Sequence, residues 1–244
     1  MSRKIVIEAS NITKRFNDMK VLDGVSFNLY EKENLVILGR SGTGKSVLLK
    51  SIVGLIKPDN GTLKVLDKDV CCLSDRELMD IRRKVGFLFQ GGALYDSMTV
   101  RENLEFPLVR KNASISKEEL EEAIMDVLES VGLKNTVNKM PGELSGGMQK
   151  RIALARTLVL KPEIMLYDEP TTGLDPVTSQ EISRLINKMR EKYNMSSLVI
   201  THDMACAKSV GDRIFLLSEG RFQEEGDFES LRNSDNAYIK AFFH

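Results

Sequence analysis

A glycine-rich segment directly after an apolar run limits the possible folds of this chain more than any other feature. Leu35 to Leu38 are consecutive apolar residues, the pattern of a strand covered on both faces. The segment that follows reads Gly39, Arg40, Ser41, Gly42, Thr43, Gly44, Lys45 and Ser46. Its spacing is G-x-x-x-x-G-K-[ST], in which glycines let several backbone N–H groups turn toward one anion. The sequence therefore predicts a phosphate-binding loop between a strand and a helix.

Two residues at the end of this loop have expected roles in nucleotide binding. Lys45 is positioned to reach the β- and γ-phosphates of a nucleotide, and the Ser46 hydroxyl to ligate Mg²⁺. The N-terminus of the helix that begins near Lys45 adds partial positive charge. The expected ATP-binding segment continues through Val47. A glycine-rich turn that matches by chance is the alternative, and the flanking strand and helix patterns disfavour it.

The composition fits a globular protein and offers no basic excess. Of the 244 residues, 42% are hydrophobic and 29% are charged, which suits one large α/β domain. Lysine plus arginine and aspartate plus glutamate both number 35, so the net charge is zero. We expect no nucleic-acid partner, because no basic excess points to one, although a neutral total leaves room for a local basic patch.

We expect a cytosolic protein, which would serve a membrane only by docking onto something already embedded there. Its apolar runs fall far short of the roughly 18 to 20 residues that span a bilayer. Arg3 and Lys4 precede only Ile5, Val6 and Ile7, whereas a secretory signal needs about 7 to 15 apolar residues.

The cysteines form an odd set without metal-ligand spacing: Cys71, Cys72 and Cys206. Cytosolic thiols stay reduced and adjacent cysteines rarely bridge. We interpret all three as packing residues, because a free cysteine behaves as a small hydrophobe.

The order of apolar runs predicts an α/β core with a largely parallel sheet. The expected strands are Ile5 to Ala9, Val25 to Tyr30, Leu35 to Leu38, Val85 to Phe89, Glu163 to Tyr167 and Leu198 to Thr201. Asp23-Gly24 and Asp59-Asn60-Gly61 are interpreted as turns between such segments. Sheets of this kind bind ligands at the carboxyl ends of their strands.

The middle of the chain is expected to be helical. Ser116 and Glu119 form a capping box, and Gly132 is the expected stop of the helix that follows. One face of that helix is apolar, with Leu120, Ala123, Ile124, Val127, Leu128 and Val131. Asp175-Pro176 begins a second helix, which directs Ile182, Leu185, Ile186 and Met189 inward. We expect a helical insertion at about 91–138 in a core formed by 1–90 and 139–244.

Polar residues follow three of the expected strands. Asp168 and Glu169 follow a buried strand, where Asp168 can hold Mg²⁺ directly or through water. Glu169 is then placed to polarise the attacking water as a general base. His202 follows the neighbouring strand and can contact the γ-phosphate, although a lone histidine is more often structural. Gln90 ends the strand Val85 to Phe89 and can ligate Mg²⁺ or the water.

A further glycine motif, read with the features above, gives a family resemblance. The segment is Leu144, Ser145, Gly146, Gly147, Met148 and Gln149. Together with the phosphate loop, the strand-end acids and His202, in this order, it resembles the ABC ATPases over essentially the whole chain. The resemblance implies a P-loop NTPase core with an antiparallel β subdomain and a helical subdomain. It also implies that ATP and Mg²⁺ bind and that ATP is hydrolysed to energise a separate membrane permease.

The resemblance also implies that a second copy of the chain completes the site. In the family this motif opens a helix, here expected from Met148 to Leu160, that binds the γ-phosphate held by the other subunit. Ser145, Gly146 and Gly147 would offer a hydroxyl and unhindered N–H groups there. Gly173-Leu174-Asp175 matches the D-loop, which communicates across the dimer, and Asp175 is equally a good helix cap.

Two apolar residues acquire a role from the resemblance alone. Phe16 stands where the family stacks an aromatic residue on adenine, with phenylalanine in place of the more frequent tyrosine. Val21 would line the same base pocket. Without the family, both would be interpreted as core residues.

Two segments are similar to the ATPase of Mla-type, Mce-associated phospholipid transporters. They are 141–148, where Met148 stands in place of the usual glutamine, and 89–100, followed by Asn103. In the family the second segment docks the permease, here near Gln90 to Val100, and a Mce-type lipid-binding protein would join the complex. The expected location is the inner face of the bacterial cytoplasmic membrane. A glycine hinge packed by Leu94, Tyr95 and Met98 is the alternative, as is another importer or extruder. The sequence ends at His244 without the longer tail of some such ATPases.

Rival classes share some of these motifs. Chromosome-maintenance ATPases carry long coiled coils between the phosphate loop and the signature, and no sustained heptads occur here. Ribosome-associated factors hold two cassettes, and this chain holds one. A P-loop kinase would have no use for Ser145, Gly146 and Gly147.

Overall fold

The computed structural model describes residues 3–243, without the side chains of residues 237, 238 and 241. Its strands are β1 Ile5–Phe16, β2 Met19–Tyr30, β3 Asn34–Leu38, β4 Asn60–Val65, β5 Lys68–Asp69, β6 Val85–Leu88, β7 Ile164–Asp168, β8 Ser196–Thr201, β9 Arg213–Ser218 and β10 Arg221–Gly226. Its helices are α1 Lys45–Ile52, α2 Asp75–Lys84, α3 Val100–Lys111, α4 Lys117–Ser130, α5 Gly146–Leu158, α6 Pro176–Tyr193, α7 Met204–Val210, α8 Phe228–Arg232 and α9 Ala237–Phe243. Short 3₁₀ turns lie at Lys134–Thr136 and Pro141–Glu143.

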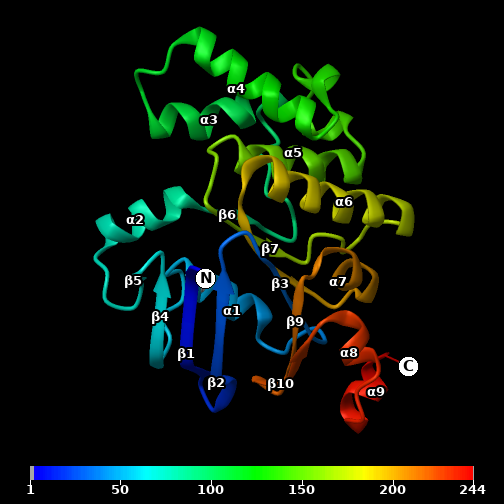
Figure 1. Ribbon diagram of the computed structural model, residues 1–244. Coiled ribbons are helices and arrows are strands. Elements are labelled where there is room, and N and C mark those ends of the chain that lie inside the picture. Colours follow the sequence, from blue (N-terminus) through cyan, green and yellow to red (C-terminus); the bar gives the residue numbers. More distant parts are fainter. Residues whose placement is uncertain (1–2, 244) are drawn as a thin grey trace.

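Two sheets form the centre of the molecule. The larger has the strand order β10-β9-β3-β8-β7-β6, and its strands run parallel except for β10, which pairs antiparallel with β9. The smaller has the order β2-β1-β4-β5 and is antiparallel. In Figure 1, α3 and α4 lie at one end of the molecule and β1, β2 and β4 toward the other. An α/β core with an antiparallel β part and a helical part, as predicted, is confirmed.

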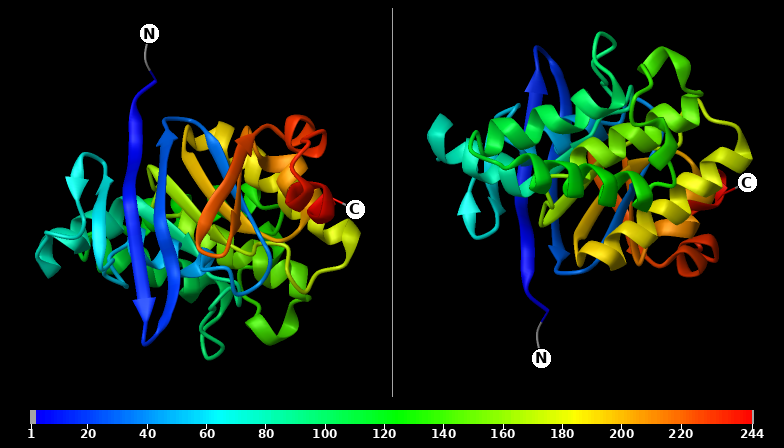
Figure 2. Two further views of the ribbon diagram at one scale, coloured as in Figure 1. Left: turned by 90° about the horizontal axis from the view of Figure 1, so that it is seen from below. Right: turned by 90° about the horizontal axis from the view of Figure 1, so that it is seen from above.

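Alternate residues of the parallel strands feed two separate cores. In β3, Val36 and Leu38 belong to one hydrophobic cluster, whereas Leu35 and Ile37 belong to the other. This follows from the period of two along a strand, which sends successive side chains to opposite faces. One cluster lies against α3 to α7 and the other against α1, α2 and the antiparallel sheet. Seen from above, α3 and α4 lie over the strands (Figure 2). The sheet is therefore covered on both faces, which explains the continuous apolar runs.

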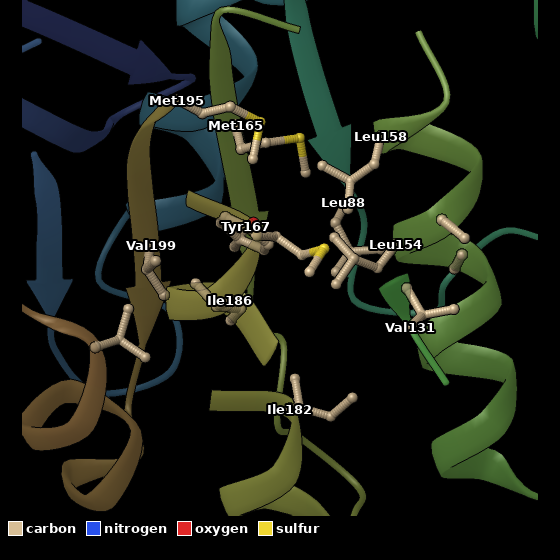
Figure 3. Packing of buried hydrophobic residues seen from close by; sticks show 14 of the residues in the cluster. Leu88, Val131, Leu154, Leu158, Met165, Tyr167, Ile182, Ile186, Met195 and Val199 are labelled. Carbon is tan, nitrogen blue, oxygen red and sulfur yellow. The ribbon is translucent and has the colours of Figure 1, made fainter. Parts of the chain in front are cut away.

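The cluster that lies against α3 to α7, here called the helix-facing cluster, joins the sheet to α5 and α6, which follow Ser145 and Asp175. Leu154 and Leu158 of α5 pack with Leu88 of β6, while Ile186 of α6 lies near Tyr167 and Ile182 lies farther along the same helix (Figure 3). All six side chains are at most 2% exposed. Burial of large apolar side chains is worth about 1.5–3 kcal/mol each. This packing fixes the ends of α5 and α6 relative to the carboxyl ends of the strands.

The predicted helix starts are confirmed. Ser116 caps α4 in a capping box with Glu119, and Asp175 caps α6 with Pro176 in its first turn. The predicted apolar face of α4 is buried or partly buried in the helix-facing cluster. The helix after the glycine motif differs from the prediction, because it begins at Gly146 and ends at Leu158. Ser145 accepts a hydrogen bond from the Met148 N–H, so it caps the helix two residues earlier than expected.

The turn predicted at Asp23-Gly24 is wrong. Both residues lie inside β2, and the chain reverses between β1 and β2 instead. Ile12 pairs with Val25 and Thr13 with Asp23, so Gly24 is the extra residue of a β-bulge, with φ 73°. A bulge needs the same left-handed backbone that glycine supplies in a turn. The local pattern alone does not separate the two.

Three smaller expectations also differ. The strand expected to reach Phe89 ends at Leu88, so Gln90 lies in the loop beyond it. The expected strand at Ile5 to Ala9 extends to Phe16. Cys206 is buried and Cys71 is half-buried, but Cys72 is exposed, so its interpretation as a packing residue is wrong. Within residues 3–243, no helix combines the length and apolar character that a membrane crossing requires, and His244 lies outside the described residues.

Candidate active site

The ends of three parallel strands bring the predicted site residues together. β3 pairs with β8 and β8 with β7, all in the same direction. Leu38, Thr201 and Asp168 end these strands, so the phosphate loop, His202 and Glu169 emerge at one edge of the sheet. A hydrogen bond of 3.2 Å from the Gly39 N–H to the Thr201 carbonyl joins the first two.

The loop residues approach their surroundings too closely for side chains at two positions. A Cβ at Gly39 would lie 2.5 Å from the Leu217 carbonyl oxygen. At Gly44 it would lie 2.6 Å from the Val21 carbonyl oxygen, and φ there is 98°. Glycine is required at both positions. Gly44 directly precedes α1, so the loop delivers its backbone to the positive end of that helix.

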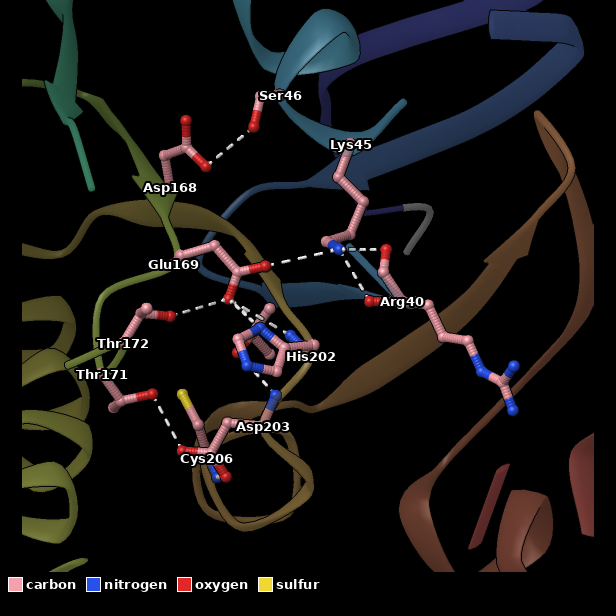
Figure 4. A network of polar contacts seen from close by, with 12 residues as sticks. Arg40, Lys45, Ser46, Asp168, Glu169, Thr171, Thr172, His202, Asp203 and Cys206 are labelled. Atoms are coloured by element: carbon pink, nitrogen blue, oxygen red, sulfur yellow. Dashed lines mark hydrogen bonds and ion pairs between the residues drawn. The ribbon is translucent and has the colours of Figure 1, made fainter. Parts of the chain in front are cut away.

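Lys45 lies inside the loop, and its ammonium has three partners. Its Nζ donates to the Gly39 carbonyl at 2.6 Å and to the Arg40 carbonyl at 2.9 Å. Glu169 Oε1 lies 3.3 Å away (Figure 4). The side chain is 5% exposed. Burial lowers the pKa of Lys45, and the neighbouring Glu169 opposes that effect. An ammonium held in this place is a fixed positive charge facing the cradle.

Glu169 lies between the lysine and the histidine. Its Oε2 is 2.8 Å from His202 Nδ1 and accepts from the His202 N–H at 3.2 Å and from Thr172 Oγ1 at 3.3 Å. The residue is 7% exposed, and its backbone is left-handed, with φ 51°. Strained backbone of this kind persists where the surrounding structure fixes it, as at functional sites. The side chain is held in one position, with its carboxylate toward the cradle.

Asp168 and Ser46 form a second pair on the other side of Glu169. The Ser46 hydroxyl donates to Asp168 Oδ1 at 3.0 Å (Figure 4). Burial raises the pKa of Asp168, while the hydrogen bond from Ser46 opposes the rise. A hydroxyl and a carboxylate are hard oxygen donors, the type that Mg²⁺ prefers. These two residues therefore fit a bound magnesium ion.

One cavity of about 630 Å³ collects most of the predicted nucleotide residues. The residues that the sequence analysis selected and that line this cavity are Phe16, Val21, Ser41, Gly42, Gly44, Lys45, Ser46, Val47, Gln90, Glu169 and His202. Gly39, Arg40, Thr43 and Asp168 lie beside the cavity and do not line it. The Arg40 side chain points away from Glu169 (Figure 4), and Thr43 Oγ1 donates to the Arg40 carbonyl at 2.9 Å. The aromatic ring, the glycine loop and the acid are thus parts of one site.

Residues that the sequence analysis did not select complete the site. Met19 and Thr172 line the cavity, and Thr172 also bonds Glu169. Thr171 donates to Asp203 Oδ2 at 2.8 Å, which joins the segment after Glu169 to the segment after His202. Thr171 and Thr172 lie two and three residues after Glu169, and this closeness in the sequence could have marked them as site residues.

Gln90 is linked to α5 by a buried lysine that the sequence analysis also missed. The Lys150 ammonium donates to the Gln90 carbonyl, and the residue is 9% exposed. Burial lowers the pKa of Lys150, and Asp168 opposes that shift. The loop that carries Gln90 into the nucleotide cavity is therefore attached to the helix that begins at Gly146.

The glycine motif at the start of α5 lies apart from the nucleotide cavity. Neither Ser145, Gly146 nor Gly147 lines that cavity, and Ser145 and Gly146 are exposed. The start of α5 is therefore exposed, and the free N–H groups at a helix N-terminus can bind an anion. Within one chain, this motif does not complete the site that holds Lys45.

Comparison with known proteins identifies the family of this geometry. The family model described as ABC transporter matches residues 22–172, which is more than half of the chain. The chain belongs to the ABC transporter family.

Two relatives of this ABC protein illustrate the range of names in the family. The probable ribonucleotide transport ATP-binding protein mkl of Mycobacterium leprae is 38% identical over 244 residues, which cover 100% of this chain and 70% of the relative. The intermembrane phospholipid transport system ATP-binding protein MlaF of Haemophilus influenzae is 35% identical over 237 residues, covering 97% and 89%.

A solved ABC cassette has the same fold. The ATP-binding cassette MJ0796, solved as a dimer in a post-hydrolysis state with ADP and Pi, superposes with a TM-score of 0.82 at 36% identity. The match covers 91% of this chain and 98% of that one. The chain is an ATP-hydrolysing, ATP-binding subunit of an ABC transporter, and it uses Mg²⁺. Held by Ser46 and Asp168, Mg²⁺ would neutralise the charge that develops on the phosphates during hydrolysis.

Proposed function

We propose that Glu169 is the general base of ATP hydrolysis. The observation that carries this proposal is the position of its buried carboxylate between Lys45 and His202. A base held within hydrogen-bond reach can accept the proton of a water aligned with the γ-phosphate. His202 orients the carboxylate through Nδ1, Lys45 holds the phosphates, and Ser46 and Asp168 hold Mg²⁺. Gln90, in the same cavity, contacts the metal or the water.

In this proposal the reaction needs two copies of the chain. Each ATP lies between one phosphate loop and the Ser145, Gly146 and Gly147 of the partner copy, and Asp175 takes part in communication across that interface. Ser145 and Gly146 are exposed and do not line the nucleotide cavity of their own chain, which supports this arrangement. Hydrolysis removes the γ-phosphate that held the halves together, and their separation resets the transporter.

The adenine base lies against Phe16 and Val21 in the same proposal. Both residues line the nucleotide cavity on the side of the antiparallel sheet, at the end of β1 and the beginning of β2. The Phe16 ring is 43% exposed. An exposed aromatic ring beside a phosphate loop has an open face on which a base can stack.

The partner that converts closure into transport is a separate permease, docked near Gln90 to Val100. This segment begins in the nucleotide cavity at Gln90, and Lys150 attaches it to α5. A partner on the segment would therefore sense the phosphate site. We place the chain on the inner face of the bacterial cytoplasmic membrane, where such a permease presents its cytoplasmic side.

The transported substrate in this proposal is a phospholipid, with a Mce-type lipid-binding protein in the complex. Similarity to MlaF, whose name states phospholipid transport, supports this reading. The mkl relative carries a ribonucleotide transport name, so a soluble solute is the second candidate. Soluble ABC ATPases that act on DNA or ribosomes are a third class, and the lack of sustained heptads between the phosphate loop and Ser145 disfavours the DNA-acting ones.

Recovery of the tagged chain from gently solubilised membranes tests this function. We expect a permease and a Mce-type protein to be recovered with bound phospholipid. Recovery of a permease with a solute-binding protein would retain the ATPase mechanism and exclude the lipid. Hydrolysis stimulated by DNA or ribosomes, with no membrane partner, would contradict the proposal.

A further inference from the structure

The glycine motif at the start of α5 lies against the start of α6 in the same chain. The two helices are neighbours (Figure 1). The nearest atom to a Cβ placed at Gly146 is Leu174 Cδ2, at 4.0 Å. The nearest atom to a Cβ placed at Gly147 is Thr178 Cγ2, at 2.5 Å. The two glycines therefore differ, because the first has room for a side chain within its own chain and the second does not.

Backbone conformation does not explain the glycine at position 147. Gly147 lies in the first turn of α5, and its φ is outside the left-handed region. Alanine is the more favourable residue in a helix. The approach of Thr178 supplies a reason for the glycine, because non-bonded carbon atoms repel one another well inside their optimal separation of about 3.5–4.0 Å. The Thr178 methyl group occupies the space that a side chain at position 147 would need.

The Thr178 hydroxyl has a different partner. Its Oγ1 donates to Asp175 Oδ2 at 2.5 Å. Asp175 Oδ1 accepts from the Val177 and Thr178 N–H groups at 3.0 Å. The hydrogen bond from the Thr178 hydroxyl is the largest cause that lowers the pKa of Asp175, which favours the charged carboxylate. One threonine therefore contacts the glycine motif through its methyl group and Asp175 through its hydroxyl.

The two segments that Thr178 joins are those that the proposed function places against the partner copy. Ser145, Gly146 and Gly147 meet the partner's ATP there, and Asp175 takes part in communication across the interface. Neither segment lines the nucleotide cavity of its own chain. Ser145, Gly146 and Asp175 are exposed, whereas Thr178 is half-buried. A fixed contact through Thr178 would keep the two segments in one relative position when the copies meet.

We propose that Thr178 is a positioning residue for ATP hydrolysis, which locks the glycine motif to Asp175 so that both reach the partner copy as one preformed surface. This inference rests on the proposed function, in which both segments act across the interface. It assigns Gly147 to a contact within its own chain and leaves Gly146 to the partner's ATP.

The test removes the Thr178 methyl group and keeps the hydroxyl. With Thr178→Ser, the atoms of residue 178 that remain near a Cβ at position 147 lie at 3.8 and 3.9 Å, which is ordinary van der Waals contact. Gly147→Ala alone should therefore force α5 and α6 apart, and Thr178→Ser should restore the room. Gly146→Ala is the comparison, because Thr178 is not among its near contacts and Thr178→Ser should not rescue it.

Dimerisation with ATP is measured by sedimentation velocity in a Glu169→Gln chain, which is expected to retain ATP. We expect Gly147→Ala to weaken the dimer at least about tenfold, and the double variant to return to within about threefold of Thr178→Ser alone. ADP lacks the γ-phosphate that joins the copies, and its binding by calorimetry should stay normal because neither residue lines the nucleotide cavity. A purely structural role would not separate dimerisation from ADP binding.

A second variant isolates the hydroxyl. Thr178→Val keeps a methyl group against Gly147 and loses the donor to Asp175. We expect the dimer to weaken about 2- to 10-fold, as for the loss of one hydrogen bond. The matched control is Thr157→Val on α5, where the hydroxyl donates to the Ala153 carbonyl at 3.1 Å, away from the motif. The control should dimerise normally.

Thermal unfolding tests the contact without a partner copy. Gly147→Ala should lower the unfolding midpoint by at least about 2 °C when Thr178 is present, because overpacking is destabilising. It should not lower the midpoint when combined with Thr178→Ser. Residues in contact show such non-additive effects, whereas distant residues do not.

The outcomes separate the inference from the proposed function. If the Glu169→Gln chain forms no dimer with ATP, the two-copy site is wrong and the inference fails with it. If that chain dimerises and the double variant stays as weak as Gly147→Ala, Gly147 serves the partner's ATP and the inference alone is wrong. Normal dimerisation by Gly147→Ala or by Thr178→Val would also overturn it.

Discussion

Replacement of Glu169 by glutamine tests the proposed base with little change of shape. The carboxylate has four contacts. Oε1 faces the Lys45 ammonium, whereas Oε2 contacts the Thr172 hydroxyl, the His202 N–H and His202 Nδ1. An amide has one oxygen and one NH₂ group. Either orientation therefore leaves one donor facing another, at a cost of about 1–3 kcal/mol in folding free energy. The variant is expected to fold, with a lower unfolding midpoint.

The effect on catalysis is expected to be much larger. A positioned general base contributes about 10²–10⁴-fold to rate, which equals about 2.7–5.4 kcal/mol of transition-state stabilisation. We expect kcat to fall by at least about 100-fold. ATP binding is expected to persist or tighten, because Lys45 loses its competing carboxylate. The bound ATP should then hold two chains together.

Phosphate release at saturating Mg-ATP measures the rate, and sedimentation velocity with ATP measures dimerisation. Glu163→Gln is the matched control, since Glu163 lies just before the opposite end of β7 with its side chain 52% exposed. We expect normal turnover from it. Turnover by the Glu169 variant within about threefold of the unaltered chain would refute the assignment, because so small a loss excludes a general base.

Three further predictions follow from contacts elsewhere. Asp175→Ala removes the cap of α6, where Oδ1 accepts from the Val177 and Thr178 N–H groups at 3.0 Å. We expect the free energy of unfolding to fall by about 1 kcal/mol and the unfolding midpoint by about 2–4 °C. Asp175→Asn should retain most of the stability. Phe16→Ala removes the proposed stacking surface, worth about 1–3 kcal/mol, so the ATP dissociation constant measured by calorimetry should rise about 5- to 150-fold, whereas Phe16→Tyr should bind normally. At pH 8 a maleimide should modify the exposed Cys72 first, and Cys206 only after unfolding, because Cys206 is 1% exposed and burial raises its pKa to about 11, so its thiol stays neutral. Peptide mass spectrometry reads that result, and early labelling of Cys206 would contradict it.

The sequence predicted those features that depend on short spacing. The phosphate loop, the capping box at Ser116 and the acids after β7 each lie within a few consecutive residues. Local spacing fixes their geometry, because the strand and the helix each have one period. The convergence of Gln90, Glu169 and His202 was also predictable, since parallel strands end at one edge.

Other features depend on pairing between distant segments. Gly24 looks like a turn residue until its strand is paired, and the register with β1 then makes it a bulge. The contact of Lys150 with Gln90 joins residues 60 positions apart, and neither has a neighbour that signals the other. Arg82, Arg110 and Arg156 line one cavity from three different helices, so no single segment of sequence contains that cavity.

Helix α5 has a mechanical consequence. It begins with the exposed glycine motif, holds the Gln90 loop through Lys150 and carries Arg156 near its end, 5.2 Å from the centre of the Tyr95 ring. Gly146 and Arg156 are ten residues apart, or about 15 Å along the axis. After Gly147 the helix contains no proline or glycine, so we expect it to move as one rigid body. One alanine inserted between Arg151 and Ala155 would rotate one end about 100° against the other. In the proposed function, such a chain would keep the glycine motif and the contact of Arg156 with Tyr95 but lose the coupling between them.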